Sequence, residues 1–532
     1  MTVNGPGGRD PRRGTPGVSA EDRSRSWDAA GGADDADGPP GPGVAGRAAS
    51  RGAVVGAATT WTRFAVQFVS LAVVARLIGP SAYGSAVTAL VAVTGAELIR
   101  SGGVTWLIGR TPQLTAGTTR TFHRLSVVLG VVAAGVTLGL AVVVPASALP
   151  AGAVTLPLLA VVFLCAGSSA VPTALLARGQ RFGTIGGAEV GAAVLSCGVA
   201  VTVALRGGGA SAPLLQAAVY AVVLCVAILL RAPIPAAPRV PLRDLRDELG
   251  FAANATAVQA MEWLARSVDR VLVAAAFGPV AAGVYAQATQ LVLLPVEQVN
   301  GPLRRAAIPA LARLLHDPAR FRTGFRTVLT AACVTIWPVV GVLAVLAEPL
   351  VVTVFGDGWR ASAAAFRLMV PMAMALTVTS VTTFAVLAGG SAARLTVWEC
   401  AVSRPTTVVA YLLGARWGVH GVAVAASIAG LVLVTPGFLV VTRTTGLRLA
   451  DLVRPLLEPT TTALVCGVAA VAVRCLVHDD RAALAVGAVT AACTWVVCVA
   501  ALPRTRGLLR DVGSVVRAPR SRDPCGLDDR AA

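Results

Sequence analysis

The segment from Ser267 to Gln290, SVDRVLVAAAFGPVAAGVYAQATQ, combines the features of a membrane helix with features that interrupt one. Most of it is apolar, but Asp269 and Arg270 open it and the pair Gly278-Pro279 divides it. Proline restricts the residue before it and cannot continue the hydrogen-bond ladder of a helix. We therefore predict two apolar helices that are joined by a tight outer turn at Gly278-Pro279.

The chain as a whole is apolar. It is 55% hydrophobic and 14% charged, whereas soluble domains carry about 25% charged residues. Its apolar runs reach the roughly 18 residues that are needed to cross a bilayer. We therefore predict an all-α polytopic membrane protein with about fourteen transmembrane helices. The expected spans are 53–75, 83–106, 122–146, 152–176, 183–205, 212–230, 250–276, 280–303, 327–352, 362–388, 392–414, 418–440, 457–476 and 482–503.

The positions of the arginines indicate the orientation. The net charge of +18 would suit a nucleic-acid partner, but the arginines concentrate in the loops on one side of the expected spans. That asymmetry follows the positive-inside rule. We therefore expect a multi-pass protein of the cell membrane with both termini in the cytoplasm and no nucleic-acid partner. The outer loops hold only Arg76, Arg206, Arg360, Arg416 and Arg481.

The expected spans divide the chain into five parts. Residues 1–50 are rich in Gly, Pro, Asp, Ser and Arg, which predicts a disordered cytoplasmic tail. An N-terminal lobe would follow at 51–235, a C-terminal lobe at 236–442, two extra transmembrane helices at 443–503, and a cytoplasmic tail at 504–532. The ten cysteines and four histidines form no metal-binding pattern, so neither a metal site nor another cofactor is predicted.

A repeat relates two regions that lie 199 residues apart. LIGPSAYGSA (77–86) and AFGPVAAGVY (276–285) share the pattern Gly-Pro-x-x-x-Gly. The last glycine of the second copy would let the two helices beside its turn approach closely. The matching residues are Gly79, Pro80 and Gly84 in the first copy and Gly278, Pro279 and Gly283 in the second.

A polar stripe recurs at the same offset. Spacings of three, four and three residues put each stripe on one helical face. The repeat spans an even number of helices, so the two six-helix lobes (spans 1–6 and 7–12) would run parallel around a central cavity, as in one class of transporters. The last two helices would be peripheral. The stripes are Thr60, Arg63, Gln67 and Ser70 in the first span and Gln259, Glu262, Arg266 and Asp269 in the seventh.

The charged residues of these stripes allow two interpretations. A charge deep in a bilayer costs roughly 2.5–3.5 kcal/mol, so such side chains should face protein or water. Glu262 can pair with Arg266 at i,i+4, and Asp269 can pair with Arg270, with these side chains reaching outward to the interface. Alternatively, the stripes face a water-filled cavity that contacts a substrate. Further intramembrane charges favour the cavity interpretation, and they are Glu97, Arg100, Glu189, Glu297, Arg367, Glu399 and Arg404. Of these, Arg100 and Arg367 equally suit the membrane interface.

Four segments together resemble the polysaccharide transport family, the Wzx-like oligosaccharide flippases of the multidrug/oligosaccharidyl-lipid/polysaccharide exporter superfamily. The resemblance covers about residues 50–440, and the turn from Phe355-Gly356 to Trp359 is among its more specific features. The segments are ARLIGPSAYGSAVTALVAV (75–93), VDRVLVAAAFGPVAAGVYAQATQL (268–291), PLRRAAIPALARLLHDPARFRTGF (302–325) and LAEPLVVTVFGDGWRASAAAFRLMVP (346–371).

The resemblance implies a monomeric flippase that moves polyprenyl-diphosphate-linked glycans from the cytoplasmic to the outer leaflet by alternating access. Arginine carries a permanent, delocalised charge that suits a diphosphate, so Arg63 and Arg266 become the candidate substrate residues. A gradient of H⁺ or Na⁺ would drive the cycle. Other partners would be membrane lipid and other polysaccharide-assembly proteins of the membrane. The candidate tuning or coupling residues are Glu262, Asp269, Glu97, Glu189, Glu297, Glu399 and Arg404.

Other functions remain open at this point. A drug or cation antiporter and a lipid II flippase belong to the same superfamily. A membrane glycosyltransferase or polymerase would need acidic catalytic groups, and the outer loops offer only Asp479-Asp480, which also suits a solvated turn. A non-transporting scaffold would not need the intramembrane charges. We therefore expect a transporter rather than an enzyme.

Overall fold

The computed structural model describes residues 42–501, apart from 102, 111–113, 235, 239 and 391. Residues up to Ala57 form one unit and those from Ala58 onwards another, and the second unit is described below. The predicted tail at 504–532 and most of the tail at 1–50 lie outside the described residues. The first described helix begins at Pro42, so residues 42–50, which we expected in the tail, are helical.

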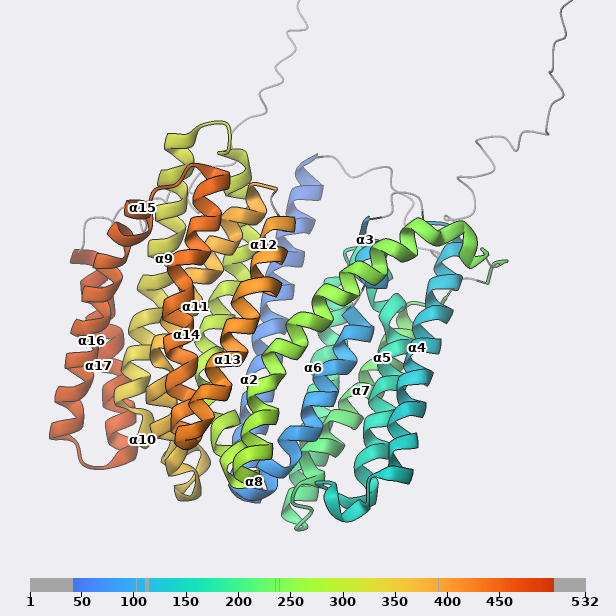
Figure 1. The fold of residues 1–532 in the computed structure, drawn as a ribbon, viewed down its shortest axis with the longest axis horizontal. Coiled ribbons are helices and arrows are strands. Elements are labelled where there is room, and N and C mark those ends of the chain that lie inside the picture. Colours follow the sequence, from blue (N-terminus) through green and yellow to red (C-terminus); the bar gives the residue numbers. More distant parts are fainter. Residues whose placement is uncertain are drawn as a thin grey trace, which may run out of the picture. The chain divides into compact units, whose positions relative to one another are not determined.

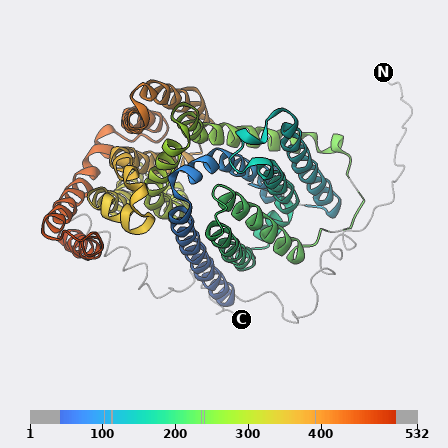
Figure 2. The ribbon, with the colours of Figure 1, turned by 90° about the horizontal axis from the view of Figure 1, so that it is seen from below.

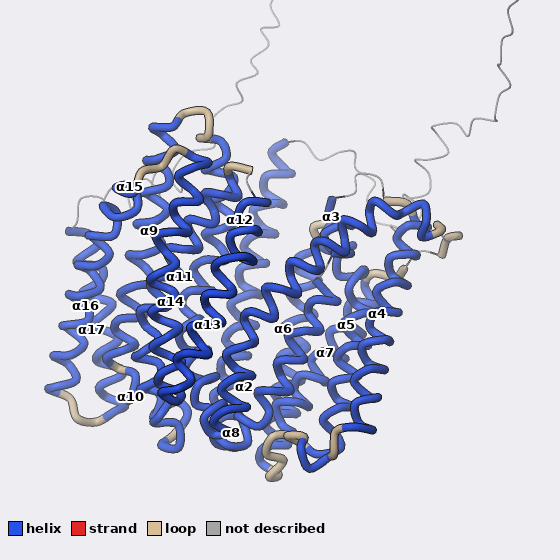
Figure 3. The backbone as a smooth tube through the Cα atoms, viewed as in Figure 1, coloured by secondary structure: helices blue, strands red, loops and turns tan. Residues whose placement is uncertain are grey.

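The described residues form helices and loops without a strand (Figure 1, Figure 3). A π-helical turn occupies Glu399–Ser403. Short 3-10 turns lie between helices, at Ala146–Ala148, Gly152–Val154, Leu242–Leu245, Asp357–Trp359, Ala415–Trp417 and Arg454–Leu456. The helices are α2 (Pro42–Ser101), α3 (Gly103–Arg110), α4 (Ala116–Val143), α5 (Thr155–Arg178), α6 (Phe182–Leu205), α7 (Ser211–Arg231), α8 (Arg246–Arg313), α9 (Pro318–Val345), α10 (Ala347–Phe355), α11 (Arg360–Ala388), α12 (Ala392–Trp398), α13 (Arg404–Gly414), α14 (Gly418–Thr445), α15 (Leu449–Val453), α16 (Leu457–Leu476) and α17 (Asp480–Ala501).

Eleven helical stretches among the described residues are long and apolar enough to cross a membrane, which confirms the polytopic all-α prediction. Three of these stretches are divided, away from their ends, by a glycine whose backbone leaves the helical conformation, with φ of 74° at Gly79, 79° at Gly278 and 74° at Gly418. Each break coincides with a predicted boundary between two spans. The count of fourteen stays a prediction.

One expected span is interrupted. We predicted a continuous helix over 327–352, but α9 ends at Val345 and α10 begins at Ala347. Pro349 explains the difference, because its ring clashes with the carbonyl four residues earlier, which is that of Val345, and its nitrogen cannot donate a hydrogen bond.

Two groups of helices pack internally. Helices α4, α5, α6 and α7 pack on one another, and α9, α11, α13 and α14 form a second group with a large buried core. The pair α16 and α17 packs against α9 and α10, at the edge of the second group (Figure 1). Figure 2 shows the part of α2 that follows Ala58 between the two groups. This segment contributes Val74 to a core with α6 and α7, and Ala75 to the core of the second group.

The two Gly-Pro turns meet each other. A Cβ atom on Gly84 would lie 1.7 Å from the carbonyl oxygen of Pro279, and one on Gly283 would lie 2.3 Å from that of Pro80. Only glycine permits this approach of two backbones. We expected Gly283 to bring together the helices beside its own turn, and that was wrong: its partner is the equivalent turn of the other repeat.

The segment around Trp359 joins the same place. The Trp359 indole is buried and its Nε1 donates to the carbonyl oxygen of Ala75 at 3.1 Å, while its ring meets that of Tyr83 edge-on. Arg76 donates to the carbonyl oxygen of Thr353 at 2.8 Å. Gly356, with φ of 96°, ends α10 and makes this turn possible. We call the contact formed by residues 75–84, 278–283 and 353–359 the turn cluster.

Candidate functional site

Arg63 and Glu189, two of the predicted site residues, form an ion pair between α2 and α6. The Nη1 atom of Arg63 lies 3.4 Å from the Oε2 atom of Glu189, and the two side chains are 33% and 20% exposed. The Nε atom of Arg63 is buried and has no hydrogen-bond partner among the described residues. The acidic neighbour that Arg63 lacks on its own helix is therefore supplied by the fifth predicted span. The guanidinium keeps donors that are not used by Glu189.

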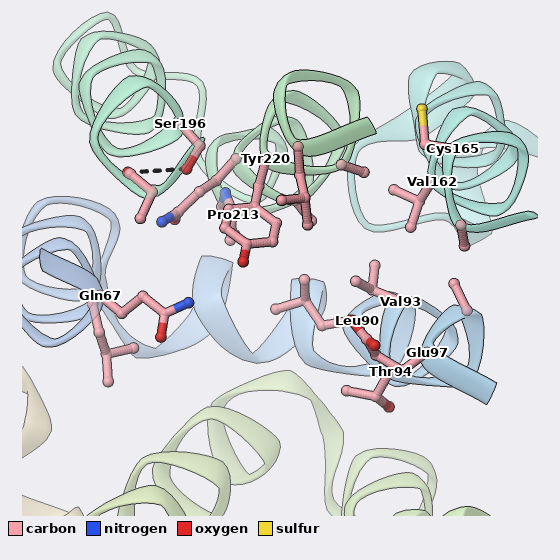
Figure 4. Close-up of a pocket in the computed structure, with 18 of the residues that line it drawn as sticks. Gln67, Leu90, Val93, Thr94, Glu97, Val162, Cys165, Ser196, Pro213 and Tyr220 are labelled. Carbon is pink, nitrogen blue, oxygen red and sulfur yellow. Dashed lines mark hydrogen bonds between the residues drawn. The ribbon is translucent and has the colours of Figure 1, made fainter. Parts of the chain in front are cut away.

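A cavity of about 430 Å³ opens beside this ion pair, between α2 and the group α5, α6 and α7 (Figure 4). It lies within the N-terminal half of the chain, except that Gln290 of α8 joins its wall. A central cavity between the two lobes stays a prediction, and the cavity of about 430 Å³ lies mostly within one half. Its walls are mostly apolar, with polar groups from Gln67, Thr94, Glu97, Ser169, Ser196, Gln216, Tyr220 and Gln290, and with Tyr83 beside them.

The polar groups of the cavity come from several helices. The amide of Gln67 and the hydroxyl of Tyr220 point into the space from opposite walls (Figure 4). Gln216 donates from Nε2 to the hydroxyl of the buried Ser70 at 2.7 Å. In Figure 4 the side chain of Gln67 lies at one end of the cavity and that of Glu97 at the other. Gln67 of the first predicted stripe therefore lines this cavity, and Ser70 of the same stripe holds Gln216 of its wall.

The charge of the cavity is distinctive. Glu97 is the acidic residue among the described residues that line it, and none of these lining residues is basic. The ion pair of Arg63 lies one helical turn before Gln67 on the same face of α2. A basic site and an arginine-free cavity are thus adjacent along one helix.

The seventh-span segment, residues 246–277 of α8, packs differently from its counterpart in α2. Its beginning contacts α3, where the backbone N–H of Gly103 donates to the Thr256 hydroxyl at 2.9 Å. Trp263 then donates from Nε1 to the hydroxyl of Thr94 on α2 at 3.0 Å. Gln259 is half-buried and Arg266 is exposed. The part of this segment up to Trp263 therefore lies against the N-terminal half.

Some predicted residues lie outside the described side chains. The side chains of Thr60 and Glu262 belong to this group, so a pair between Glu262 and Arg266 stays a prediction. Glu297 is exposed on α8. Arg367, which we also considered for the interface, donates from Nε to the carbonyl oxygen of Ala344 and lies 3.9 Å from Glu348.

Asp269, at the end of the seventh-span stripe, is buried rather than directed towards the interface. Its carboxylate accepts the Tyr285 hydroxyl at 3.0 Å and the backbone N–H of Arg270 at 2.8 Å. Tyr285 is itself 1% exposed and lies in the core of the C-terminal half. The arrangement ties the seventh span to the eighth and gives Asp269 a structural position. Arg270 is half-buried, and its Nε is buried without a hydrogen-bond partner among the described residues.

Glu399 and Arg404 form a second ion pair, at 3.0 Å, with both side chains partly buried. Glu399 is the first residue of the π-helical turn between α12 and α13, and Arg404 directly follows that turn. Such turns are rare and occur frequently at functional sites. This pair gives the C-terminal half a charged site of its own, apart from the cavity.

Several residues of the cavity escaped the sequence analysis. Gln216 and Gln290 are single amides in apolar spans, which was a usable signal, whereas Tyr83 and Tyr220 resemble ordinary core or interface aromatics. Within the described part of the chain, no group of three or more His, Cys, Asp or Glu side chains is placed to hold a metal ion.

Three kinds of comparison relate the chain to known proteins. The model of the family "Polysaccharide biosynthesis protein" matches residues 73–364, which is more than half of the chain. Teichuronic acid biosynthesis protein TuaB of Bacillus subtilis (strain 168) is 26% identical over 121 residues, which cover 23% of this chain and 25% of TuaB. An uncharacterized membrane protein in the cps region of Klebsiella pneumoniae is 25% identical over 125 residues, covering 24% and 26%. Each alignment thus spans about a quarter of the relative's length.

Solved structures share the fold. The inward closed conformation of the lipid II flippase MurJ superposes with a TM-score of 0.68 at 11% identity, over 86% of this chain and 99% of MurJ. An inward-facing multidrug MATE transporter of the MOP superfamily gives a TM-score of 0.52 at 17% identity, over 72% and 94%. The resemblance inferred from the turn motifs is confirmed: the chain belongs to the polysaccharide biosynthesis protein family and has the fold of the multidrug/oligosaccharidyl-lipid/polysaccharide exporter superfamily.

Proposed function

We propose that the protein is a flippase that moves a polyprenyl-diphosphate-linked glycan from the cytoplasmic to the outer leaflet of the cell membrane by alternating access. The observation that carries the proposal is the partly exposed Arg63 within an apolar helix, next to a cavity that contains several polar groups, in a member of a polysaccharide biosynthesis family. A diphosphate cannot cross hydrocarbon alone, whereas a guanidinium fork can replace part of its hydration.

The Arg63–Glu189 pair suits a binding site that is alternately empty and occupied. A buried, unpaired charge is costly, so Glu189 stabilises Arg63 when no substrate is bound. An incoming diphosphate would compete with Glu189 for the guanidinium. Arg266, exposed on the equivalent helix of the second repeat, would supply a second cation. A proton or Na⁺ taken up by Glu189 or Glu97 would couple the release of substrate to an ion gradient.

The turn cluster suits one end state of such a cycle. It joins the two repeats at the end of the bundle that we assign to the outer face, because the loops there are poor in arginine. Alternating access would require these contacts to separate.

The test is complementation of a deletion strain. Without the protein, lipid-linked oligosaccharide should accumulate on the cytoplasmic side and surface glycan should fall. Arg63→Gln and Arg266→Gln should each fail to restore export although protein levels in the membrane stay normal. Arg206→Gln, in an outer loop, is the matched control. Normal export by both Arg63→Gln and Arg266→Gln, or unchanged glycan pools in a deletion strain without a redundant paralogue, would contradict the proposal.

A drug or cation antiporter is the second candidate, because Glu97 gives the arginine-free cavity an acidic lining. Efflux of an organic cation that depends on Glu97, with unchanged lipid-linked glycan pools in the deletion strain, would favour it over the flippase.

A further inference from the structure

We propose that Gln287 of α8 limits the stability of the closed contact between the two repeats, because its amide is buried in that contact without a hydrogen-bond partner from the protein. The amide regains partners when the turns separate. This inference rests only on the alternating-access step of the proposed function and does not depend on the identity of the substrate. It assigns to one side chain a part in setting the balance between the closed and the open state.

Gln287 is an unusual buried side chain. It is 0% exposed, and both its Nε2 and its Oε1 atom are buried without a hydrogen-bond partner among the described residues. In the described part of the chain, no other side chain has two buried polar atoms in this condition. A glutamine amide offers two N–H donors and one carbonyl acceptor. The protein therefore uses none of the hydrogen-bonding capacity of this side chain.

The position of Gln287 on α8 directs it towards α2. Gly283, Gln287 and Gln290 lie at i, i+4 and i+7 on one helical face. A Cβ atom on Gly283 would lie 2.3 Å from the carbonyl oxygen of Pro80 on α2. Gln290 lines the cavity of the N-terminal half. Gln287 therefore lies in the interface between the two halves, one helical turn further along α8 than the turn cluster.

The opposite face of α8 belongs to the core of the C-terminal half. There the Tyr285 hydroxyl donates to Asp269, and the Thr289 hydroxyl donates to the carbonyl oxygen of Tyr285. The polar groups of that face are paired, whereas the amide of Gln287 is not. The unpaired amide is thus a feature of the contact between the halves and not of the C-terminal core.

The first repeat has no equivalent of this amide. The offset of 199 residues pairs Gln287 with Thr88, which is exposed. The Thr88 hydroxyl donates to the carbonyl oxygen of Ser85 at 3.2 Å. One copy of the repeat therefore carries a polar side chain that is satisfied within its own helix, and the other carries one without a protein partner.

The buried amide opposes the contacts that hold the turn cluster together. A buried polar group without a hydrogen bond destabilises the state that buries it. The hydrogen bonds donated by Trp359 and Arg76 act in the other direction and stabilise the closed turns. When the turns separate, water reaches the amide and the penalty disappears. Alternating access needs closed and open states of similar free energy, and Gln287 brings the two closer together.

The test replaces Gln287 by methionine, whose side chain has nearly the same length but no N–H or carbonyl group. The purified full-length protein in lipid nanodiscs is compared with the wild type in two measurements that need no substrate. The Tm of Gln287→Met should be higher. The thiol of Val91→Cys should react about tenfold more slowly with a maleimide in the presence of Gln287→Met, because removing one unpaired amide shifts the equilibrium between closed and open turns by about that factor.

Val91 reports on the interface because it lies on the face of α2 that meets α8. Gly84, Val91 and Gly95 are at i, i+7 and i+11 of the same helix. A Cβ atom on Gly95 would lie 3.1 Å from the ring of Trp263 on α8, and Val91 is 7% exposed. The ten native cysteines are replaced in this background, so that only the introduced thiol reacts.

The matched control is Gln298→Met, which makes the same change at a half-buried glutamine of α8 and should leave both measurements near their wild-type values. An unchanged or lower Tm in Gln287→Met, which is the result expected if an enclosed water satisfies the amide, would overturn the inference. An unchanged or faster reaction of the thiol, or equal effects in Gln298→Met, would also overturn it.

A second variant covers the case in which Gln287→Met does not fold, since Gln287→Leu must then show the same two changes. The outcomes are separate from those of the flippase test. Unchanged glycan pools in the deletion strain would contradict the flippase and leave this inference standing, because neither measurement uses the substrate.

Discussion

The first-span segment, residues 58–78 of α2, and the seventh-span segment, residues 246–277 of α8, occupy equivalent positions in the repeat but have different partners. Both end at a glycine with nearly the same backbone angles, φ 74° and ψ 173° at Gly79 against φ 79° and ψ −178° at Gly278. Their polar side chains, however, form bonds and ion pairs with partners on different helices.

Two polar side chains of the first segment bond within the N-terminal half. Arg63 pairs with Glu189 and Ser70 accepts from Gln216, and both partners belong to α6 or α7. The side chains of the seventh segment have partners in both halves. Trp263 contacts Thr94 of the N-terminal half, whereas Asp269 accepts from Tyr285, in the core of the C-terminal half. The backbone break is thus repeated, whereas the environment of each stripe is not.

The substitution with the largest expected effect lies in the turn cluster, where the two copies of the repeat remain alike. Gly84→Ala would place a methyl group against the carbonyl oxygen of Pro279. Overpacking costs about 1–3 kcal/mol, which shifts an equilibrium between closed and open turns by about five- to 140-fold. Export should fall, and a cysteine introduced at the buried Ala86 should react faster with a membrane-impermeant maleimide.

Gly135→Ala is the control for that substitution, because nothing lies within 4 Å of a Cβ at Gly135. Unchanged export and labelling in Gly84→Ala would show that the close contact between the turns is not essential to the cycle.

The second prediction compares how much stability is lost when the last residue of each stripe, Asp269 or Ser70, loses its hydrogen bond. Tyr285→Phe leaves the buried Asp269 carboxylate without its hydroxyl donor and should lower the free energy of unfolding by about 1–3 kcal/mol. Ser70→Ala removes the neutral hydrogen bond from Gln216 and should cost only about 0.5–1.5 kcal/mol. Thermal unfolding of the purified variants measures both. A larger loss in Ser70→Ala would reverse the assignment of Asp269 as the stronger structural anchor.

The smallest effect on stability is expected at the partly exposed ion pair. Glu189→Gln should lower the free energy of unfolding by about 1 kcal/mol or less, since solvent screens a pair of this exposure. The exchanged pair, Arg63→Glu with Glu189→Arg, should regain that stability but not export, because the guanidinium then projects from α6. Thermal unfolding and surface-glycan assays distinguish the two effects. Full export by the exchanged pair would show that the position of the cation along α2 does not matter.

Local patterns were enough to predict much of the fold. The apolar runs indicated membrane helices, and the two Gly-Pro pairs marked breaks that the backbone confirms at Gly79 and Gly278. These features depend on covalent geometry and on the length of apolar sequence, so they can be read from neighbouring residues. The same reasoning overlooked the break before Pro349 in the ninth span.

The candidate site was predicted less completely. Arg63, Gln67 and Ser70 were identified from their helical spacing, but the partners Glu189 and Gln216 lie far away in sequence. Asp269 was grouped with the functional stripe, although its carboxylate is buried against Tyr285. Spacing identifies the face of a helix that is polar, but it does not identify what that face contacts.

The sequence by itself therefore determined a helical membrane protein with a parallel repeat, two glycine-proline turns and two polar stripes. Only the tertiary structure decided that the turns contact each other, that Arg63 pairs with Glu189, and that the cavity lies within the N-terminal half. The physical reason is that helix formation and helix breaks arise from near neighbours along the chain. Ion pairs, close backbone contacts and cavities depend on how separate helices pack, and the two copies of the repeat pack differently.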